Sequence, residues 1–386
     1  MDELKSHGYS KIRTLPKALN EDELCKAVKG VHIVGIRSKS QITKKVLECA
    51  DKLLAVGCFC IGTNQVDLEA ATTRGIAVFN APYSNTRSVA ELVIGLFVML
   101  IRRIPDKNRA AHEGVWLKES EGSYELRGKT LGIVGYGNIG SQVSVLAESL
   151  GLNVVYYDIV TKLPHGNAKQ AKSLKELLQH SDIVTLHVPS DETTRNMINS
   201  ESLKNLKKGS IFVNYSRGDV VDLGALRDAI ETGKVSGAAV DVFPVEPKKS
   251  GEAFQSVLQN LPNVILTPHI GGSTQEAQVN IGVDAASKLI NYLELGTSTG
   301  SHTVPPVSLS PQRETHRILH IHRNKPGVLS EINSDLSDEG INIVGQYLKT
   351  NEEIGYVILE IDSDLSDKAF EILKDIEGTI KTRMVY

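Results

Sequence analysis

Three short segments contain residues of the kinds needed for acid–base chemistry on a small acid. Arg217 lies in NYSRGD, Glu246 in DVFPVEP and His269 in TPHIGG, and each segment follows a predicted strand. An arginine can bind a carboxylate through two parallel hydrogen bonds. A histidine is the usual general base near neutral pH, and a nearby glutamate would orient its ring. These segments predict a catalytic set, although a lone strand-end histidine is more often structural and a lone glutamate is often a surface carboxylate.

A glycine-rich segment indicates a dinucleotide as reaction partner. LGIVGYGNIG (131–140) places Gly135, Gly137 and Gly140 in G-x-G-x-x-G spacing between an apolar strand and a helical run. These glycines allow a sharp turn, a close approach to a pyrophosphate and helix–strand packing, and the phosphates lie at the helix N-terminus. Asp158 ends the next predicted strand, where a carboxylate binds ribose hydroxyls and repels a 2′-phosphate. We therefore expect NAD; the alternative is a glycine-rich turn without a ligand.

A basic turn follows the first predicted strand, 31–36. Arg37, Ser38 and Lys39 bring two cations and a hydroxyl to that strand's carboxyl end. Ligands of parallel sheets bind beyond such ends. The turn therefore suits a carboxylate or phosphate, and the equally weighted alternative is a solvated basic turn.

The elements that position these residues alternate between strand and helix. This order predicts an α/β protein with two doubly wound parallel-sheet domains. A Gly/Ser/Pro-rich linker starts at 296, and βαββαβ order follows from 317, which is the ferredoxin-like pattern. The expected domains are a discontinuous flavodoxin-like domain (1–84 and 272–313), a Rossmann domain (85–271) and a ferredoxin-like domain (314–386). Residues 1–7 resemble the middle of a helix with no strand before it, so we expect the natural start to lie upstream.

Composition excludes several classes of protein. The net charge of −3 argues against a nucleic-acid binder. No stretch reaches the roughly 18 apolar residues of a membrane span, and the N-terminus is too polar for a signal peptide. The four cysteines form no C-x-x-C pair, which is typical of reduced thiols in a cytoplasmic protein.

Together, these motifs resemble the D-2-hydroxyacid dehydrogenase family. Further segments, including GCFCIGTN (57–64), NTRSVAELV (85–93) and GGSTQEAQ (271–278), are similar to its D-3-phosphoglycerate dehydrogenase branch with one C-terminal ACT domain. The similarity spans nearly the whole chain. It implies that His269 is the acid/base, Glu246 its partner and Arg217 the residue that binds and polarises the 2-hydroxy acid.

The resemblance also implies two sets of ligand-binding residues. NAD would contact Gly135, Gly137, Asn138, Ile139, Gly140, Asp158, Tyr215, Ser216, Arg217, Asp241, His269, Ile270, Gly271 and Gly272. The substrate would contact Arg37, Ser38, Lys39, Asn85, Lys118 and Gln278. Lys39 stands where arginine is often found, and Lys118 matches a region that reaches a neighbouring subunit. Trp116 resembles an interface anchor, with core packing as the alternative.

The ferredoxin-like domain resembles an ACT amino-acid sensor. The resemblance implies an L-serine site at His322, Asn324 and Asn342, with the loop from His322 to Gly327 receiving the amino acid. His320 and His322 share a strand face, yet no third metal ligand is evident, and we expect no metal. The linker reads SPQRET (310–315) instead of the adjacent glycines of some members, so serine inhibition could be weaker or differently transmitted.

The activity implied is NAD-dependent oxidation of D-3-phosphoglycerate to 3-phosphohydroxypyruvate, the first committed step of L-serine biosynthesis. Feedback inhibition by serine, reduction of 2-oxoglutarate and a homotetramer are also implied. The alternatives are a dehydrogenase of another 2-hydroxy acid and a non-catalytic NAD-sensing regulator on the same fold. The basic turn and the ACT domain favour oxidation of D-3-phosphoglycerate over both alternatives.

Overall fold

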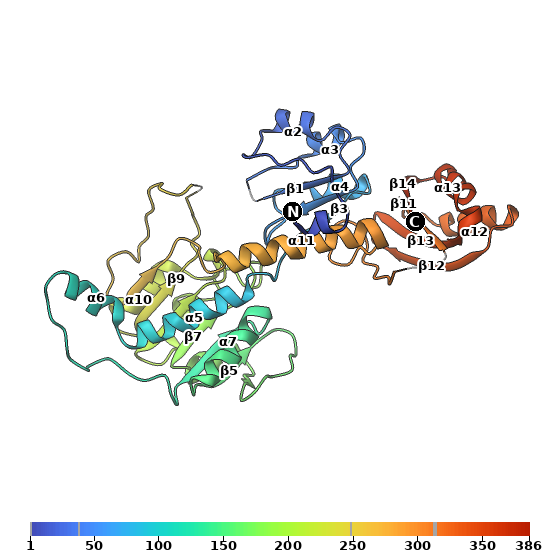
Figure 1. Cartoon of the computed structure of the whole chain (residues 1–386). Coiled ribbons are helices and arrows are strands. Elements are labelled where there is room, and N and C mark those ends of the chain that lie inside the picture. The colour runs from blue at the N-terminus through green and yellow to red at the C-terminus, as the bar shows by residue number, and fades with distance from the viewer. Residues whose placement is uncertain (1, 38, 248, 312–314) are drawn as a thin grey trace. The chain divides into compact units, whose positions relative to one another are not determined.

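A computed structural model describes residues 2–37, 39–247, 249–311 and 315–386. The chain forms two compact units, Met1–Ser84 with Gln278–Tyr386, and Asn85–Ala277 (Figure 1). The division into three domains stays a prediction. Within the described residues, no helix is long and apolar enough to cross a membrane.

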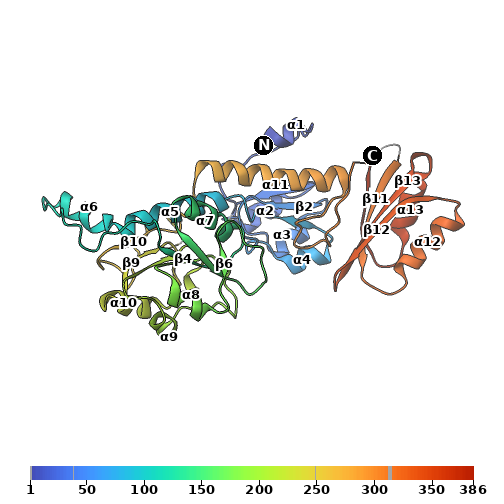
Figure 2. The ribbon, with the colours of Figure 1, turned by 90° about the horizontal axis from the view of Figure 1, so that it is seen from below.

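The unit Asn85–Ala277 is built on a seven-stranded sheet in the order β10-β9-β8-β7-β4-β5-β6, and every pairing is parallel. Helices α5 and α7 cover one face, and α8, α9 and α10 cover the other (Figure 2). This is the predicted doubly wound arrangement. The strands are β4 (Thr130–Val134), β5 (Asn153–Tyr157), β6 (Lys169–Gln170), β7 (Ile183–Leu186), β8 (Ser210–Asn214), β9 (Val235–Val240) and β10 (Val264–Leu266).

The helices of this unit begin with α5 (Thr86–Ile101), most of whose apolar side chains are buried against the sheet, while Val98 and Met99 are exposed. Asn85 is its N-cap, but its side chain makes no capping hydrogen bond. The others are α6 (Ile104–His112), α7 (Asn138–Ser149), α8 (Leu174–His180), α9 (Ser200–Lys204), the 3₁₀ turn η1 (Gly218–Val220) and α10 (Leu223–Glu231).

The other unit contains a three-stranded parallel sheet, β1-β2-β3, formed by Ile33–Ile36, Ala55–Cys58 and Ala77–Phe79. One face of the sheet is covered by short helices whose apolar residues form a single core. The helices of this part are α1 (Asp2–Ser6), α2 (Glu21–Ala27), α3 (Lys44–Cys49), α4 (Leu68–Thr73) and the long α11 (Gln275–Leu295), which begins in one unit and ends in the other.

The C-terminal part of the same unit is an antiparallel sheet in the order β12-β13-β11-β14. Its helices bury one sheet face, as the βαββαβ pattern predicts. Its other face shares a core with Leu289 and Tyr292 of α11 and with Phe79 of β3. The elements are β11 (Thr315–Arg323), α12 (Val328–Asp338), β12 (Ile343–Thr350), β13 (Ile354–Asp362), η2 (Ser363–Leu365), α13 (Ser366–Asp375) and β14 (Thr379–Val385).

The predicted strand 31–36 starts two residues later in the structure, at Ile33, and the strand predicted from 317 starts two residues earlier, at Thr315. The sequence analysis missed α2 and the two-residue strand β6. Both lack a continuous apolar run, which is the signal that marks the longer elements.

Candidate active site

The glycine segment turns sharply between β4 and α7. Gly135 has φ +91°, and a Cβ there would lie 2.5 Å from the carbonyl oxygen of His187. A Cβ on Gly140 would collide with the carbonyl oxygen of Gly135, whereas one on Gly137 would meet nothing within 4 Å. Two glycines therefore close the turn, and the third leaves an open face at the start of α7. No side chain caps α7, so its first N–H groups are available to an anion.

Asp158 follows β5 and lies beside this turn. One carboxylate oxygen accepts from the backbone N–H of Tyr136 (2.8 Å), and the other accepts from that of Val160 (2.9 Å). The acid is thereby tied to the residue between the first two glycines. This geometry suits recognition of a ribose with free hydroxyls and disfavours a phosphate on it.

A buried carboxylate organises the loop after β10. Asp241 is 2% exposed, and its two oxygens accept from the backbone N–H groups of Ile270 (2.9 Å) and Gly271 (2.8 Å). Thr267 donates its hydroxyl to the same carboxylate (2.5 Å) and hydrogen-bonds Tyr215 (2.7 Å). Burial raises the pKa of Tyr215 to about 12, so its hydroxyl keeps its proton. Residues of three strand ends are thus joined in one network.

The same loop presents His269 to Glu246. Nδ1 of the imidazole lies 2.8 Å from Oε2 of the carboxylate, and Oε1 accepts from the backbone N–H of Phe243 (3.0 Å). His269 has φ +54°, and its N–H donates to the Asp241 carbonyl (2.8 Å). Its side chain is 54% exposed, and no described residue hydrogen-bonds Nε2. The arrangement leaves one ring nitrogen available for proton transfer while a carboxylate holds the other.

Arg217 lies at the end of β8, next to the loop that carries Glu246. A Cβ on Gly218 would collide with the backbone of Phe243 and Pro244, so only glycine allows this approach. The Asn214 amide donates to the Arg217 carbonyl (3.0 Å) and accepts from Ser216. The Arg217 side chain is exposed; within the described structure its only hydrogen bond is to the Ser216 carbonyl (2.7 Å). Its other guanidinium N–H groups are available to a carboxylate.

Asn85 lies against the glycines that follow His269. A Cβ on Gly272 would collide with the Asn85 amide, and one on Gly271 would lie 3.1 Å from the Asp241 carboxylate. The predicted catalytic residues and most of the predicted cofactor-binding residues therefore belong to strand ends and adjoining loops of one unit.

Among the remaining predicted substrate residues, a direct contact joins only Arg37 and Gln278 within the described structure. Arg37 donates to the side-chain oxygen of Gln278 (2.6 Å), and Lys39 is exposed in the same turn. Ser38 lies outside the described residues. Lys118 is exposed in the loop after α6 and makes no hydrogen bond or ion pair with a described residue, and Trp116 in that loop is 84% exposed. Core packing of this tryptophan is excluded within the single chain.

The predicted amino-acid site adjoins β11 and α12. Asn324 donates its amide to the Asn351 carbonyl (2.7 Å), and Gly327 begins α12 with φ +99°. His322 stacks on His320 with 5.2 Å between ring centroids, and burial lowers the pKa of both rings. Asn342 is exposed. No group of three or more potential metal ligands occurs in the part of the chain that the structure describes.

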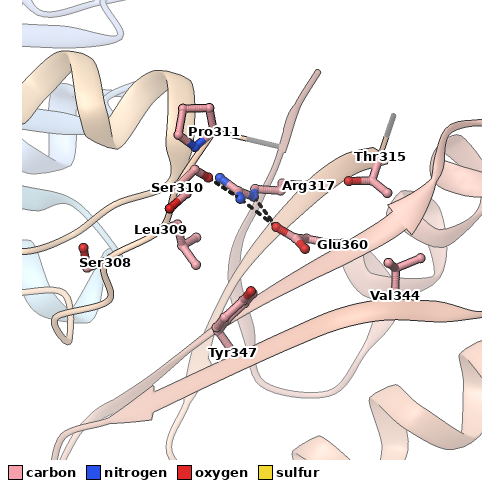
Figure 3. A pocket seen from close by; sticks show the side chains of 9 residues that line it. All are labelled: Ser308, Leu309, Ser310, Pro311, Thr315, Arg317, Val344, Tyr347 and Glu360. Atoms are coloured by element: carbon pink, nitrogen blue, oxygen red, sulfur yellow. Dashed lines mark hydrogen bonds and ion pairs between the residues drawn. The ribbon is translucent and has the colours of Figure 1, made fainter. Parts of the chain in front are cut away.

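A hollow of about 400 Å³ lies between the linker and the C-terminal sheet (Figure 3). Arg317 is 3% exposed at its wall and donates to Glu360 (2.6 and 2.8 Å). It also donates to the carbonyls of Ser310 (2.6 Å) and Leu295 (3.0 Å). This buried cation joins the linker and the end of α11 to β13.

The sequence analysis missed Thr267 and Gly218. Thr267 connects the buried carboxylate to Tyr215, and Gly218 allows two loops to touch. Both lie inside segments that the analysis singled out, but their roles depend on contacts between loops far apart in sequence. A motif gives the residue types at such positions but not the contacts.

Comparisons with known proteins show the families that the parts of this chain resemble. Residues 94–271 match the NAD-binding domain of D-isomer-specific 2-hydroxyacid dehydrogenases, and residues 318–381 match an ACT domain like that of acetohydroxyacid synthase small subunits. The chain is 52% identical to D-3-phosphoglycerate dehydrogenase of Haemophilus influenzae and 50% identical to that of Escherichia coli K12. Each alignment covers 100% of this chain and 94% of the relative.

A solved structure shares the dehydrogenase part. D-lactate dehydrogenase from Aquifex aeolicus, in complex with NAD and lactic acid, superposes with a TM-score of 0.62 at 26% identity. The match covers 79% of this chain and 95% of that one.

Proposed function

The chain belongs to the D-3-phosphoglycerate dehydrogenases, NAD-dependent oxidoreductases of the D-2-hydroxyacid dehydrogenase family, and on that premise we propose that it oxidises D-3-phosphoglycerate to 3-phosphohydroxypyruvate. This reaction is the first committed step of L-serine biosynthesis. The observation that carries the proposal is the 2.8 Å contact between His269 and Glu246, in the unit that holds the glycine turn.

NAD fits the residues present at the glycine turn and would accept the hydride from C2 of the substrate. The open face at Gly137 and the uncapped start of α7 at Asn138 and Ile139 suit the pyrophosphate. Asp158 would bind the adenosine ribose. Tyr215, Ser216, Asp241 and the loop 269–272 are assigned to the nicotinamide side.

His269 is assigned the proton transfer. Its Nε2 would accept the proton of the C2 hydroxyl, while Glu246 holds Nδ1–H and stabilises the imidazolium. Arg217 would bind the substrate carboxylate and stabilise the charge that develops on the C2 oxygen. The loops that carry these three residues are fixed by Asp241 and by the Gly218 contact, so their geometry is set before substrate binds.

The remaining substrate contacts are assigned by residue type. Arg37 and Lys39 would bind the phosphate, and Gln278 would orient Arg37 through their 2.6 Å hydrogen bond. Asn85, Ser38 and Lys118 complete the proposed set. For Lys118 we propose that its site is reached in a neighbouring subunit of a homotetramer.

The remaining proposals concern regulation, domain organisation, a side activity and cellular location. L-serine would bind His322, Asn324 and Asn342 of an ACT domain at 314–386 and inhibit the enzyme. The other proposed domains are 1–84 with 272–313 for substrate and 85–271 for NAD. Reduction of 2-oxoglutarate is proposed as a side activity, and the four free cysteines favour the cytoplasm.

The test is the initial rate of NADH formation from D-3-phosphoglycerate and NAD, with the keto product trapped, in the presence and absence of millimolar L-serine. We expect activity that serine suppresses. If serine does not change the activity, the dehydrogenase assignment stands and the proposed serine site is refuted. If D-lactate, glycerate or 2-hydroxyglutarate supports a higher rate, another 2-hydroxy acid is the substrate. Binding of NAD without turnover of any of these acids would favour a regulator.

A further inference from the structure

Two cysteines from different helices pack into the same apolar core, on one face of the β1–β3 sheet. Cys25 lies in α2 and is 8% exposed, and Cys49 is the last residue of α3. The Cys25 thiol donates to the Lys45 carbonyl over 3.7 Å. In an α-helix that carbonyl also accepts from the N–H four residues later, which is that of Cys49.

The direction of helical side chains brings the two sulfur atoms close together. A side chain on a helix leans toward the N-terminus, so the Cys49 thiol leans back over the turn that begins at Lys45. Cys25 belongs to the apolar core of this sheet, and Cys49 packs against the same core. The neighbouring Cys49 thiol and burial both raise the pKa of Cys25, which agrees with two thiols on facing sides of the helix–helix contact.

Three polar contacts hold these helices at a fixed separation. Lys45 of α3 forms ion pairs with Asp22 (2.7 Å) and Glu21 (3.6 Å) of α2. Thr43, the N-cap of α3, donates to Glu21 (2.5 Å). A bond between the sulfur atoms requires a separation of about 2.05 Å, so the proposal requires these contacts to keep the helices close enough for the two side chains to meet.

We propose that Cys25 and Cys49 are a modification site: an oxidisable thiol pair that forms an intramolecular disulfide when the protein meets a peroxide. Cys49 is the more exposed partner, so its thiolate attacks the peroxide, giving a sulfenic acid and one water or alcohol. The Cys25 thiolate then attacks that sulfur and releases water. Two thiols are oxidised to one disulfide and one peroxide is reduced.

The bridge would close a loop that contains Arg37 and Lys39. These cations lie between the two cysteines in the chain, and α3 follows their turn directly. The proposed site is independent of the function proposed above, because it depends only on contacts between α2 and α3.

The chain contains a matched control pair. Cys58 is fully buried at the end of β2, and burial raises its pKa to about 12. Cys60 donates to the Gly62 carbonyl (3.3 Å) and accepts from Gln65 (2.9 Å). Cys60 lies in a bend just beyond β2, and its sulfur is hydrogen-bonded to Gly62 and Gln65 rather than to Cys58. We expect this pair to stay reduced.

The experiment treats the reduced full chain with hydrogen peroxide, alkylates the remaining thiols and digests with trypsin without reductant. Tryptic peptides 18–26 and 46–52 carry Cys25 and Cys49, whereas 53–74 carries both control cysteines. Mass spectrometry should find 18–26 joined to 46–52, with loss of two hydrogens, and 53–74 doubly alkylated. Dithiothreitol should separate the joined peptides, and a non-reducing gel should show only monomeric chains.

Two variants complete the test. Cys25→Ser should abolish the joined peptide and leave Cys49 as a sulfenic acid that dimedone labels, whereas Cys58→Ser should leave the joined peptide unchanged. The proposal is overturned if wild-type peptide 46–52 is oxidised without joining 18–26, or if only 53–74 is oxidised. It also fails if no cysteine is oxidised by excess peroxide, or if the joined peptides come from disulfide-linked dimers.

Discussion

At the scale of single residues, the position of His269 is set by its backbone more than by its carboxylate partner. Its φ of +54° is uncommon for a residue other than glycine, and such conformations persist only where neighbours enforce them. Here the enforcing group is Asp241, which binds the two following N–H groups. Glu246 is therefore free to act mainly on the charge and tautomer of the ring.

This division of roles predicts the effect of Glu246→Gln. The ring should stay in place, but the imidazolium loses its carboxylate, so kcat should fall by about 10²-fold or more. Steady-state rates with saturating substrate and NAD measure this loss. Exposed Glu231→Gln is the control, and a variant with the wild-type kcat would contradict the assignment.

Asp158 is expected to decide between the two nicotinamide cofactors. In Asp158→Ser the charge that repels a 2′-phosphate is lost while a small hydrogen-bonding group remains. The ratio of kcat/KM for NADP to that for NAD should rise at least about tenfold, which is about 1.4 kcal/mol. Both kcat/KM values are measured with saturating substrate, beside the surface variant Asp228→Ser. An unchanged ratio would show that selectivity lies elsewhere.

For some of the residues that the sequence analysis identified, the motif was enough to predict their spatial neighbours, and for others it was not. Glu246 and His269 are 23 residues apart, yet both follow strands whose carboxyl ends share one sheet edge, so their meeting was predictable. The buried role of Asp241 was not, because a carboxylate in a motif looks the same whether it faces a ligand or a loop. Only the three-dimensional packing of the loops distinguishes these cases.

At the scale of elements, strand β11 contributes side chains to two separate hydrophobic cores, one on each face of its sheet. Leu319 and Ile321 lie in the core shared with α11, whereas Ile318 lies in the core beneath α12 and α13. His320 lies on the second face, is fully buried and bonds to Thr379 (2.8 Å). Its Nδ1 has no partner among the described residues. Apolar residues on both faces predicted a buried strand, but not what covers the second face.

The buried imidazole predicts an acid-sensitive C-terminal sheet. Burial, with the neighbouring His322, lowers the pKa of His320 to about 4 from 6.5. Between these values the unfolded chain binds the proton more readily, so stability is lost as pH falls through this window. From pH 7 to 5 the loss should be about 2 kcal/mol.

Hydrogen exchange of the β11 amides, corrected for the intrinsic rate at each pH, measures this loss. In His320→Gln the pH dependence should weaken to the part contributed by the buried His322, whereas exposed His180→Gln should keep it in full. Equal β11 protection at pH 5 and pH 7 in the wild type would refute the prediction.

The Arg317–Glu360 pair connects elements rather than catalytic groups (Figure 3). In Glu360→Gln the buried guanidinium keeps two carbonyl partners but loses its counter-charge, and removal of one partner of a buried pair costs about 3–5 kcal/mol. The linker near Ser310 should then be cut faster by proteases. Time courses of limited proteolysis compare this variant with Glu371→Gln, which breaks only the exposed pair with Lys374. Equal cleavage rates would contradict this role for the pair.

At the scale of the whole molecule, composition and periodicity predicted the classes of sheet but not the grouping of the parts. The Gly/Ser/Pro-rich linker suggests an independent C-terminal domain. The structure groups that domain with the N-terminal sheet in one compact unit, through the core that contains Phe79, Tyr292 and Tyr356. Tyr356 also donates to the Gly296 carbonyl (2.7 Å). A linker's composition reports its flexibility in isolation, whereas such contacts depend on residues far along the chain.

The loop after α6 is relevant to the proposed homotetramer. Trp116 is 84% exposed, and its neighbours Val115 and Leu117 are 51% and 44% exposed. A tryptophan among exposed aliphatic residues is typical of an interface anchor, and its truncation commonly costs at least about 2 kcal/mol of binding free energy. Trp116→Ala should therefore raise the subunit dissociation constant by about 30-fold or more. Sedimentation velocity over a dilution series would show smaller species at concentrations where the wild type stays assembled.

The control variant is Leu163→Ala, which removes a side chain that is 88% exposed elsewhere in the same unit. This variant should leave assembly unchanged. Equal dissociation of the two variants would show that the loop after α6 is not the interface.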